Sequence, residues 1–122
     1  MKSNKEILDL IGELIIKNAF DNQYRFIKNN VSDLSLTEEY SNLFKNMLPI
    51  QKLEIEKYTS EILKGFLFDI LTVFEENEEF KVIFEENGKI VNLVEISDML
   101  KAEPIIENGW IERFSKYVTK DK

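Results

Sequence analysis

Apolar side chains recur at helical spacing along the first quarter of the chain. Ser3 followed by Glu6 is a capping-box pattern, and the apolar residues after it share one helix face: Ile7, Leu8, Ile11, Leu14, Ile15, Ala19 and Phe20. This spacing predicts a helix from residue 4 to about 28. The polar stretch that follows, from Asn29 to Ser35, predicts a connection.

Two further helices are predicted in the middle of the chain. A start signal at Ser35 or Thr37 precedes a short amphipathic pattern made of Tyr40, Leu43, Phe44, Met47 and Leu48. Pro49 either ends that helix or opens the next one, because proline is tolerated only in a first turn. From Ile50 to about Glu76, a broad apolar stripe predicts the central core helix: Ile55, Tyr58, Ile62, Leu63, Phe66, Leu67, Ile70, Leu71 and Phe74.

The period of the pattern changes to two at Phe80, which predicts a β-hairpin over about residues 80–94. Asn87 and Gly88 form the turn, because a two-residue type I′ turn needs positive φ at both positions. That loop length sets the register, with Glu86 opposite Lys89 as an ion pair, Phe84 opposite Val91, and Val82 opposite Leu93. A lone hairpin is marginally stable in water, so it should pack on the helices.

The C-terminal part predicts two more helical elements. Ser97 and Asp98 can cap a brief turn that ends near Pro104. Beyond it, helical spacing predicts a terminal helix through Trp110, Ile111, Phe114, Tyr117 and Val118. We therefore expect one domain, residues 1–122, of the α+β class and predominantly helical, with three amphipathic helices, one β-hairpin and a C-terminal helix.

The run from residue 107 to 117, Glu-Asn-Gly-Trp-Ile-Glu-Arg-Phe-Ser-Lys-Tyr, follows the predicted hairpin. Together with the hairpin, it resembles the ending of small uncharacterised bacterial proteins. The resemblance covers the C-terminal half of the chain. It implies a bacterial domain and no particular activity.

The composition excludes most enzyme classes. The chain has no cysteine and no histidine, which removes thiolate nucleophiles, the usual transition-metal ligands and the commonest general base. Asp69 shares a helix face with Glu61 and Glu76, but they lie two turns apart, roughly 10–12 Å, which suits solvation better than acid-base catalysis. We therefore expect a non-enzymatic protein with no catalytic residue, no metal and no cofactor.

Charge and hydropathy limit the partners. No run approaches the ~18 uninterrupted apolar residues of a membrane span, and the N-terminal pattern lacks the apolar core of a signal peptide, so a cytoplasmic protein without a membrane partner is expected. A net charge of −7 repels phosphate backbones, which argues against nucleic acid. A basic protein is the more plausible partner.

Carboxylates concentrate around the end of the third helix and the hairpin, where Lys81 is the single cation among Glu75, Glu76, Glu78, Glu79, Glu85 and Glu86. This acidic patch could attract a basic partner, or it could be an ordinary solvated surface. A cation site is a third reading, although the run lacks the Gly-centred loop of an EF-hand. The leading hypothesis is a protein-binding module, such as an immunity or inhibitor-like protein, that engages a basic partner through the patch.

The competing hypothesis is a homo-oligomeric structural domain. In that case a contact surface made of Phe68, Ile83 and Ile90 would be buried between copies. Phe68 could instead pack under the hairpin. The aromatic stripe of Trp110, Phe114 and Tyr117 is interpreted as core rather than as a ligand shelf, with Arg113 and Lys116 facing water.

Overall fold

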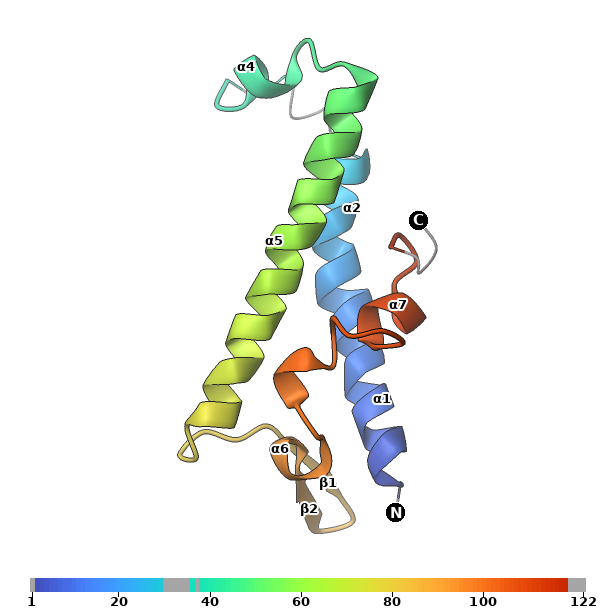
Figure 1. The fold of residues 1–122 in the computed structure, drawn as a ribbon, viewed down its shortest axis with the longest axis vertical. Helices are drawn as coiled ribbons and strands as arrows, with labels where there is room; N and C mark the ends of the chain where they lie inside the picture. Colours follow the sequence, from blue (N-terminus) through green and yellow to red (C-terminus); the bar gives the residue numbers. More distant parts are fainter. Residues whose placement is uncertain (1, 30–35, 37, 119–122) are drawn as a thin grey trace.

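The computed structural model describes residues 2–29, 36 and 38–118. Two long helical segments lie close together at one end of the molecule and diverge towards the other (Figure 1). The hairpin and the C-terminal elements pack around the diverging ends. The fold is α+β and predominantly helical, as the sequence predicts.

The first long segment is continuous from Asn4 to Asn29, in agreement with the predicted helix. It consists of α1 (Asn4–Ile15), a π-helical turn η1 (Ile16–Phe20) and α2 (Asp21–Asn29). The Ser3 hydroxyl accepts from the Glu6 backbone N–H and the Glu6 carboxylate accepts from the Ser3 N–H, which confirms the capping box. The π turn leaves no signal in the apolar spacing, and it was not predicted.

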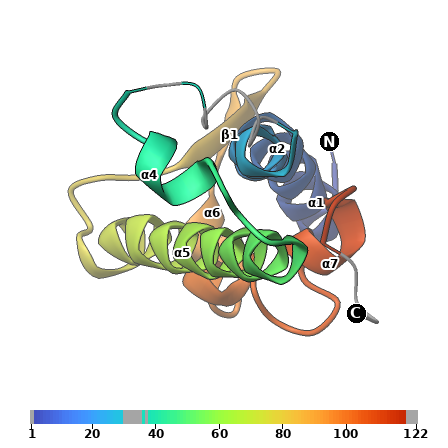
Figure 2. The ribbon, with the colours of Figure 1, turned by 90° about the horizontal axis from the view of Figure 1, so that it is seen from above.

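The second predicted helix shrinks to the single turn α4 (Ser41–Phe44), in which Phe44 is buried. Its predicted start, Ser35 or Thr37, lies outside the described residues. Pro49 opens the long helix α5 (Pro49–Glu76), so the prediction of a helix to about residue 76 is confirmed. Seen along the long axis, α4 and α2 lie on one side of α5, and α7 lies beside α1 (Figure 2).

The predicted core stripe of α5 is only half right. Leu63, Leu67 and Leu71 pack in or against the core, as predicted. The other half of the stripe is solvent-exposed, and Glu56 and Ser60, which lie outside the predicted stripe, are buried. The buried Glu56 carboxylate is paired with Lys28 of α2, whose Nζ lies 3.6 Å away. A stripe of nine apolar residues is too wide for a helix that packs with one side only.

The hairpin forms with the predicted turn and register. Strands β1 (Ile83–Glu86) and β2 (Lys89–Asn92) pair antiparallel, with Glu86 opposite Lys89 and Phe84 opposite Val91. Asn87 and Gly88 both have positive φ, 52° and 82°. The predicted ion pair is replaced, because Glu86 binds Lys2 Nζ at 3.1 Å instead of Lys89.

The hairpin is shorter than predicted in both strands, because β1 begins at Ile83 rather than Phe80 and β2 ends at Asn92 rather than Val94. Leu93 N–H donates to Val82 O at 3.0 Å, and the chain then enters the helical turn α6 (Leu93–Ile96). The Asn92 side chain caps this turn by accepting from Val94 N–H. The prediction of strand through residue 94 is therefore wrong, because a local cap competes with further pairing.

The C-terminal elements are η2, a 3₁₀ turn (Leu100–Ala102), and α7 (Trp110–Phe114). The predicted terminal helix ends at Phe114 rather than Val118. Ser115 is responsible: its hydroxyl accepts from the Tyr117 and Val118 N–H groups and donates to the Asp21 carboxylate at 2.6 Å. The chain therefore turns towards α2 instead of continuing as a helix.

Trp110 lies at the centre of the core and is fully buried. It packs with Ile16, Phe20, Leu71, Leu93, Leu100 and Ile111. Its indole ring lies directly against Gly12 of α1, so that a Cβ at position 12 would lie 2.5 Å from ring atoms. Only glycine lets the helix and the indole approach this closely.

We predict opposite effects for two glycine-to-alanine changes in helix interiors. Gly12→Ala should destabilise the fold by about 1–2 kcal/mol, because the clash with the buried indole exceeds the better helix propensity of alanine. Gly65→Ala should stabilise it by about 0.5–1 kcal/mol, because nothing lies within 4 Å of the added Cβ. Chemical denaturation of both variants measures the two effects, and a tolerated Gly12→Ala would contradict the described Trp110 packing.

Candidate functional site

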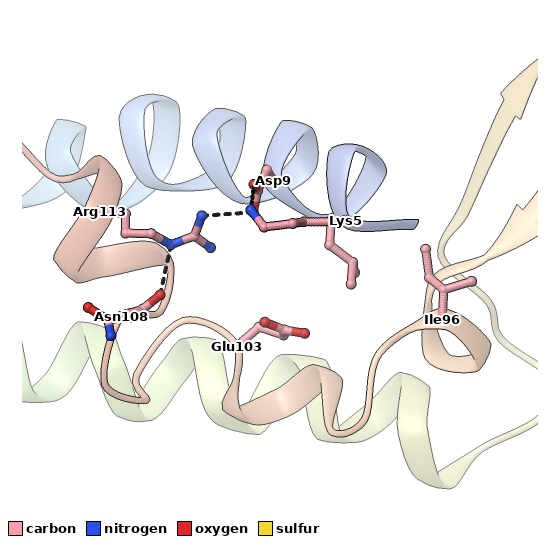
Figure 3. Close-up of a pocket in the computed structure, with 7 residues that line it drawn as sticks. Lys5, Asp9, Ile96, Glu103, Asn108 and Arg113 are labelled. Atoms are coloured by element: carbon pink, nitrogen blue, oxygen red, sulfur yellow. Dashed lines mark hydrogen bonds and ion pairs between the residues drawn. The ribbon is translucent and has the colours of Figure 1, made fainter. Parts of the chain in front are cut away.

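A charged cleft of about 460 Å³ lies between α1, α6 and the segment that leads into α7 (Figure 3). Its lining combines two cations, two carboxylates and three uncharged residues: Lys5, Leu8, Asp9, Ile96, Glu103, Asn108 and Arg113. Equal numbers of opposite charges in one cleft can either serve a ligand or bind each other. The contacts decide between these two roles.

Three of the four charged side chains of this cleft bind one another. Asp9 accepts from Lys5 Nζ and from Arg113 Nη1, both at 2.9 Å, and Arg113 Nε donates to the Asn108 carbonyl at 2.7 Å (Figure 3). Glu103 accepts from the Ser97 hydroxyl at 2.6 Å. These contacts join α7 to α1. Arg113 is exposed, as predicted, but its guanidinium also connects two elements that are far apart in sequence.

The Asp9 carboxyl responds to these contacts. Partial burial by itself would raise its pKa, but the hydrogen bonds and charges of Lys5 and Arg113 outweigh that effect and lower the pKa below its usual value. A lowered pKa means that the folded state prefers the ionised carboxylate. The cleft is therefore a structural contact that is stable when Asp9 is charged, rather than a site for a proton donor.

The predicted acidic patch is distributed over three surroundings. Glu75 accepts from the Lys101 backbone N–H at 2.7 Å, and Glu76 lies 3.9 Å from Lys101 Nζ, so these two connect α5 to η2. Glu86 accepts from Lys2, whose hydrogen bonds lower the pKa of that carboxyl. Glu76, Glu78, Glu79 and Glu85 are exposed, whereas Glu75 and Glu86 are half-buried. Half of the predicted patch thus makes contacts within the protein.

The predicted contact surface is also divided. Phe68 is half-buried beside η2, with Lys101 Nζ 5.5 Å from its ring centroid, so it packs neither under the hairpin nor fully in solvent. Ile83 and Ile90 are exposed on the hairpin. Trp110 is core, as interpreted from the sequence, while Phe114 and Tyr117 are half-buried.

Helix α5 presents a surface that the sequence analysis did not identify. Its outer face, defined here as Tyr58, Ile62, Phe66, Ile70 and Val73, follows steps of four, four, four and three residues and so forms one line along the helix. These five side chains are 39–64% exposed. Exposed apolar residues are ordinary when scattered, but a continuous stripe marks an interaction surface. The excessive width of the predicted core stripe was the signal for it.

A row of carboxylates borders the outer face of α5 on one side. Its members, Glu54, Glu61, Asp69 and Glu76, are all exposed and stand about two helical turns apart. Glu61 and Glu76 each lie within ion-pair distance of a cation, Lys64 at 3.8 Å and Lys101 at 3.9 Å. Among the described residues, no cation pairs with Glu54 or Asp69. We call these four residues the acidic row.

The chain matches no protein-family model, and no solved structure matches it. In the part of the chain that the structure describes, no three carboxylates come together in a group that could hold a metal ion. Of the helices described, none has both the length and the apolar content needed to cross a bilayer. The outer face of α5 and its acidic row are the features from which a function can be argued.

We predict that Asp9→Asn destabilises the protein by about 0.5–1 kcal/mol at pH 7, the range of a partly exposed ion pair. Because the folded pKa of Asp9 lies below that of the unfolded chain, its contribution is present above about pH 4 and is lost as the pH falls through the folded pKa. The difference between wild type and variant should therefore shrink as the pH falls through the folded pKa of Asp9 and disappear below it. Denaturation at several pH values measures the free energy of unfolding of both proteins. The control is Glu85→Gln at an exposed position, which should not lower the free energy of unfolding at pH 7.

Proposed function

We propose that this protein is a non-enzymatic protein-binding module that receives a basic, amphipathic helix of its partner on the outer face of α5. The observation that carries the proposal is the pairing of an exposed apolar stripe with a continuous row of carboxylates on one helix. A helix that lays its apolar side onto such a stripe is a common mode of peptide recognition.

The apolar stripe supplies the affinity. Covering an exposed Phe66 or Ile62 removes apolar surface from water, at roughly 25 cal/mol for each Å². Large side chains at four-residue spacing are the anchors that an opposing helix contacts at its own i, i+4 positions. Aromatic anchors contribute strongly at the centres of interfaces, and Phe66 lies in the middle of the outer face.

The acidic row supplies the specificity. Carboxylates two turns apart match lysines or arginines at the same spacing on a facing helix. Glu78 and Glu79 of the predicted patch continue the negative charge just beyond the end of α5. Such an arrangement attracts a basic partner at long range and loses that attraction in high salt. Neutralising a basic protein, as an immunity protein or inhibitor does, is one activity of this kind.

Charge also favours a basic partner over a second copy. When two identical helices pair antiparallel about a two-fold axis, the same border of each helix meets its counterpart. The acidic row would then face another acidic row, and like charges in opposition are destabilising. A helix with cations on the matching border avoids this repulsion.

We predict that the double change Ile62→Ser with Phe66→Ser weakens binding of a probe peptide by at least tenfold while leaving stability within about 0.5 kcal/mol, because both side chains are exposed in the free protein. The probe is a designed 18-residue helix with leucines along one side and lysines along one border. Calorimetry measures the affinity, and NMR shifts of labelled protein locate the contact. Leu53→Ser is the matched control, since Leu53 is equally exposed but lies on the opposite side of α5.

The charge component has its own test. Glu61→Lys with Asp69→Lys should weaken binding of the lysine-bearing peptide and strengthen binding of a version that has glutamates in place of lysines. The control, Glu95→Lys with Asp98→Lys, changes the net charge equally and should have little effect on either affinity. Equal binding of both peptides to wild type would contradict the acidic row's role. Peptide-induced shifts confined to other elements would contradict the outer face as the site. Sedimentation showing a stable dimer that Ile62→Ser dissociates would favour the homo-oligomer instead.

A further inference from the structure

A second cleft, of about 250 Å³, lies where the π turn η1 meets the C-terminal segment. Its lining comes from η1, α2, α7 and the residues just after α7: Lys17, Asp21, Asn22, Arg25, Phe114, Lys116 and Tyr117. It does not share a residue with the outer face of α5 or the acidic row. It was not identified from the sequence, because its cations come from two ends of the chain.

The cleft is positively charged, whereas the protein as a whole is negatively charged. Three cations and one carboxylate line it, and Glu13 outside the lining pairs with Lys17 at 2.7 Å, so the local net charge is about +1 in a chain with a net charge of −7. Lys116 is exposed, as the sequence predicts, and it lines the same cleft as Lys17 and Arg25 of the first long helical segment. The composition of an acidic chain does not by itself predict a local positive site.

The one carboxylate in the lining accepts hydrogen bonds from uncharged donors. Asp21 is buried, and its two oxygens accept from the Ser115 hydroxyl at 2.6 Å and the Lys116 backbone N–H at 2.9 Å. It therefore fixes the backbone that carries Lys116 without pairing with the Lys116 ammonium. A π turn places this aspartate, and such turns are frequent at functional sites.

The cations differ in how far they are neutralised. Lys17 binds Glu13 at 2.7 Å on the helix surface. Arg25 is oriented by a hydrogen bond from its Nη2 to the Asn22 side-chain oxygen at 2.6 Å, which leaves other N–H groups of the guanidinium available. Lys116 Nζ lies 5.4 Å from the Tyr117 ring centroid. Within residues 2–29, 36 and 38–118, no carboxylate pairs with the side chain of Arg25 or Lys116.

We infer that this cleft binds a phosphate dianion, either free or carried by a small phosphomonoester. Arginine offers planar paired donors that match phosphate oxygens, and lysine adds a compact positive charge beside it. Asn22 and the aromatic ring of Tyr117 orient the two cations before a ligand arrives, which reduces the entropy lost on binding. A dianion gains more than a carboxylate does from the same two charges.

The test is a calorimetric titration of the full chain at constant ionic strength with inorganic phosphate, adenosine monophosphate and adenosine. We expect saturable binding of at least one of the two phosphates and none of adenosine; which phosphate binds tells a free ion from a phosphomonoester. Arg25→Gln with Lys116→Gln should weaken that binding at least tenfold. Lys45→Gln with Lys57→Gln removes the same charge from exposed lysines elsewhere and should leave the affinity unchanged.

Circular dichroism of each variant establishes that it is folded, and the single change Lys116→Gln serves if the double variant is not. Absence of saturable binding to either phosphate would overturn the inference. Equal weakening in both double variants would also overturn it, since binding would then follow net charge rather than this cleft. Because the cleft and the outer face of α5 share no residue, failure of one proposal leaves the other untouched.

Discussion

The packing of the Trp110 indole on Gly12 is the contact on which the rest of the structure depends. It brings the C-terminal segment against α1 at van der Waals distance, and the remaining core side chains from η1, α5, α6 and η2 gather around the ring. The indole Nε1 has no hydrogen-bond partner among the described residues, so the contact is stabilised by burial and shape rather than by polar pairing. A side chain at position 12 would clash with the ring, and a smaller side chain at position 110 would leave a cavity in the core.

Polar contacts then fix what the indole brings together. Asp9 with Arg113, Asp21 with Ser115, and Glu75 with the Lys101 backbone each join segments that are distant in sequence. From the sequence, Glu75 was predicted to belong to an acidic patch and Arg113 to face water, and no role was predicted for Asp9 or Asp21. Buried or half-buried carboxylates in such a small domain are stabilised by these partners, because an unpaired charge in the same place would cost several kcal/mol.

Helix α5 remains uncovered on its outer side. Helix α5 has 28 residues, and the segments that pack on it cover only one of its sides. The apolar residues on the uncovered side find no partner within the described chain. The proposed docking of a basic helix on the apolar stripe and its acidic border follows from that geometry. The basic cleft lies elsewhere, where the C-terminal segment meets η1 and α2.

The sequence by itself determined the local elements. Period 3.6 located the first helix and α5, the capping box fixed Ser3 as the first cap, and Asn87-Gly88 set the hairpin register, because each depends on neighbours a few residues away. Tertiary structure alone decided which half of the α5 stripe is buried, why α7 stops at Phe114, and which carboxylates are already paired. These outcomes depend on contacts such as Asp21 with Ser115, 94 positions apart, and no local pattern encodes which distant side chain will arrive.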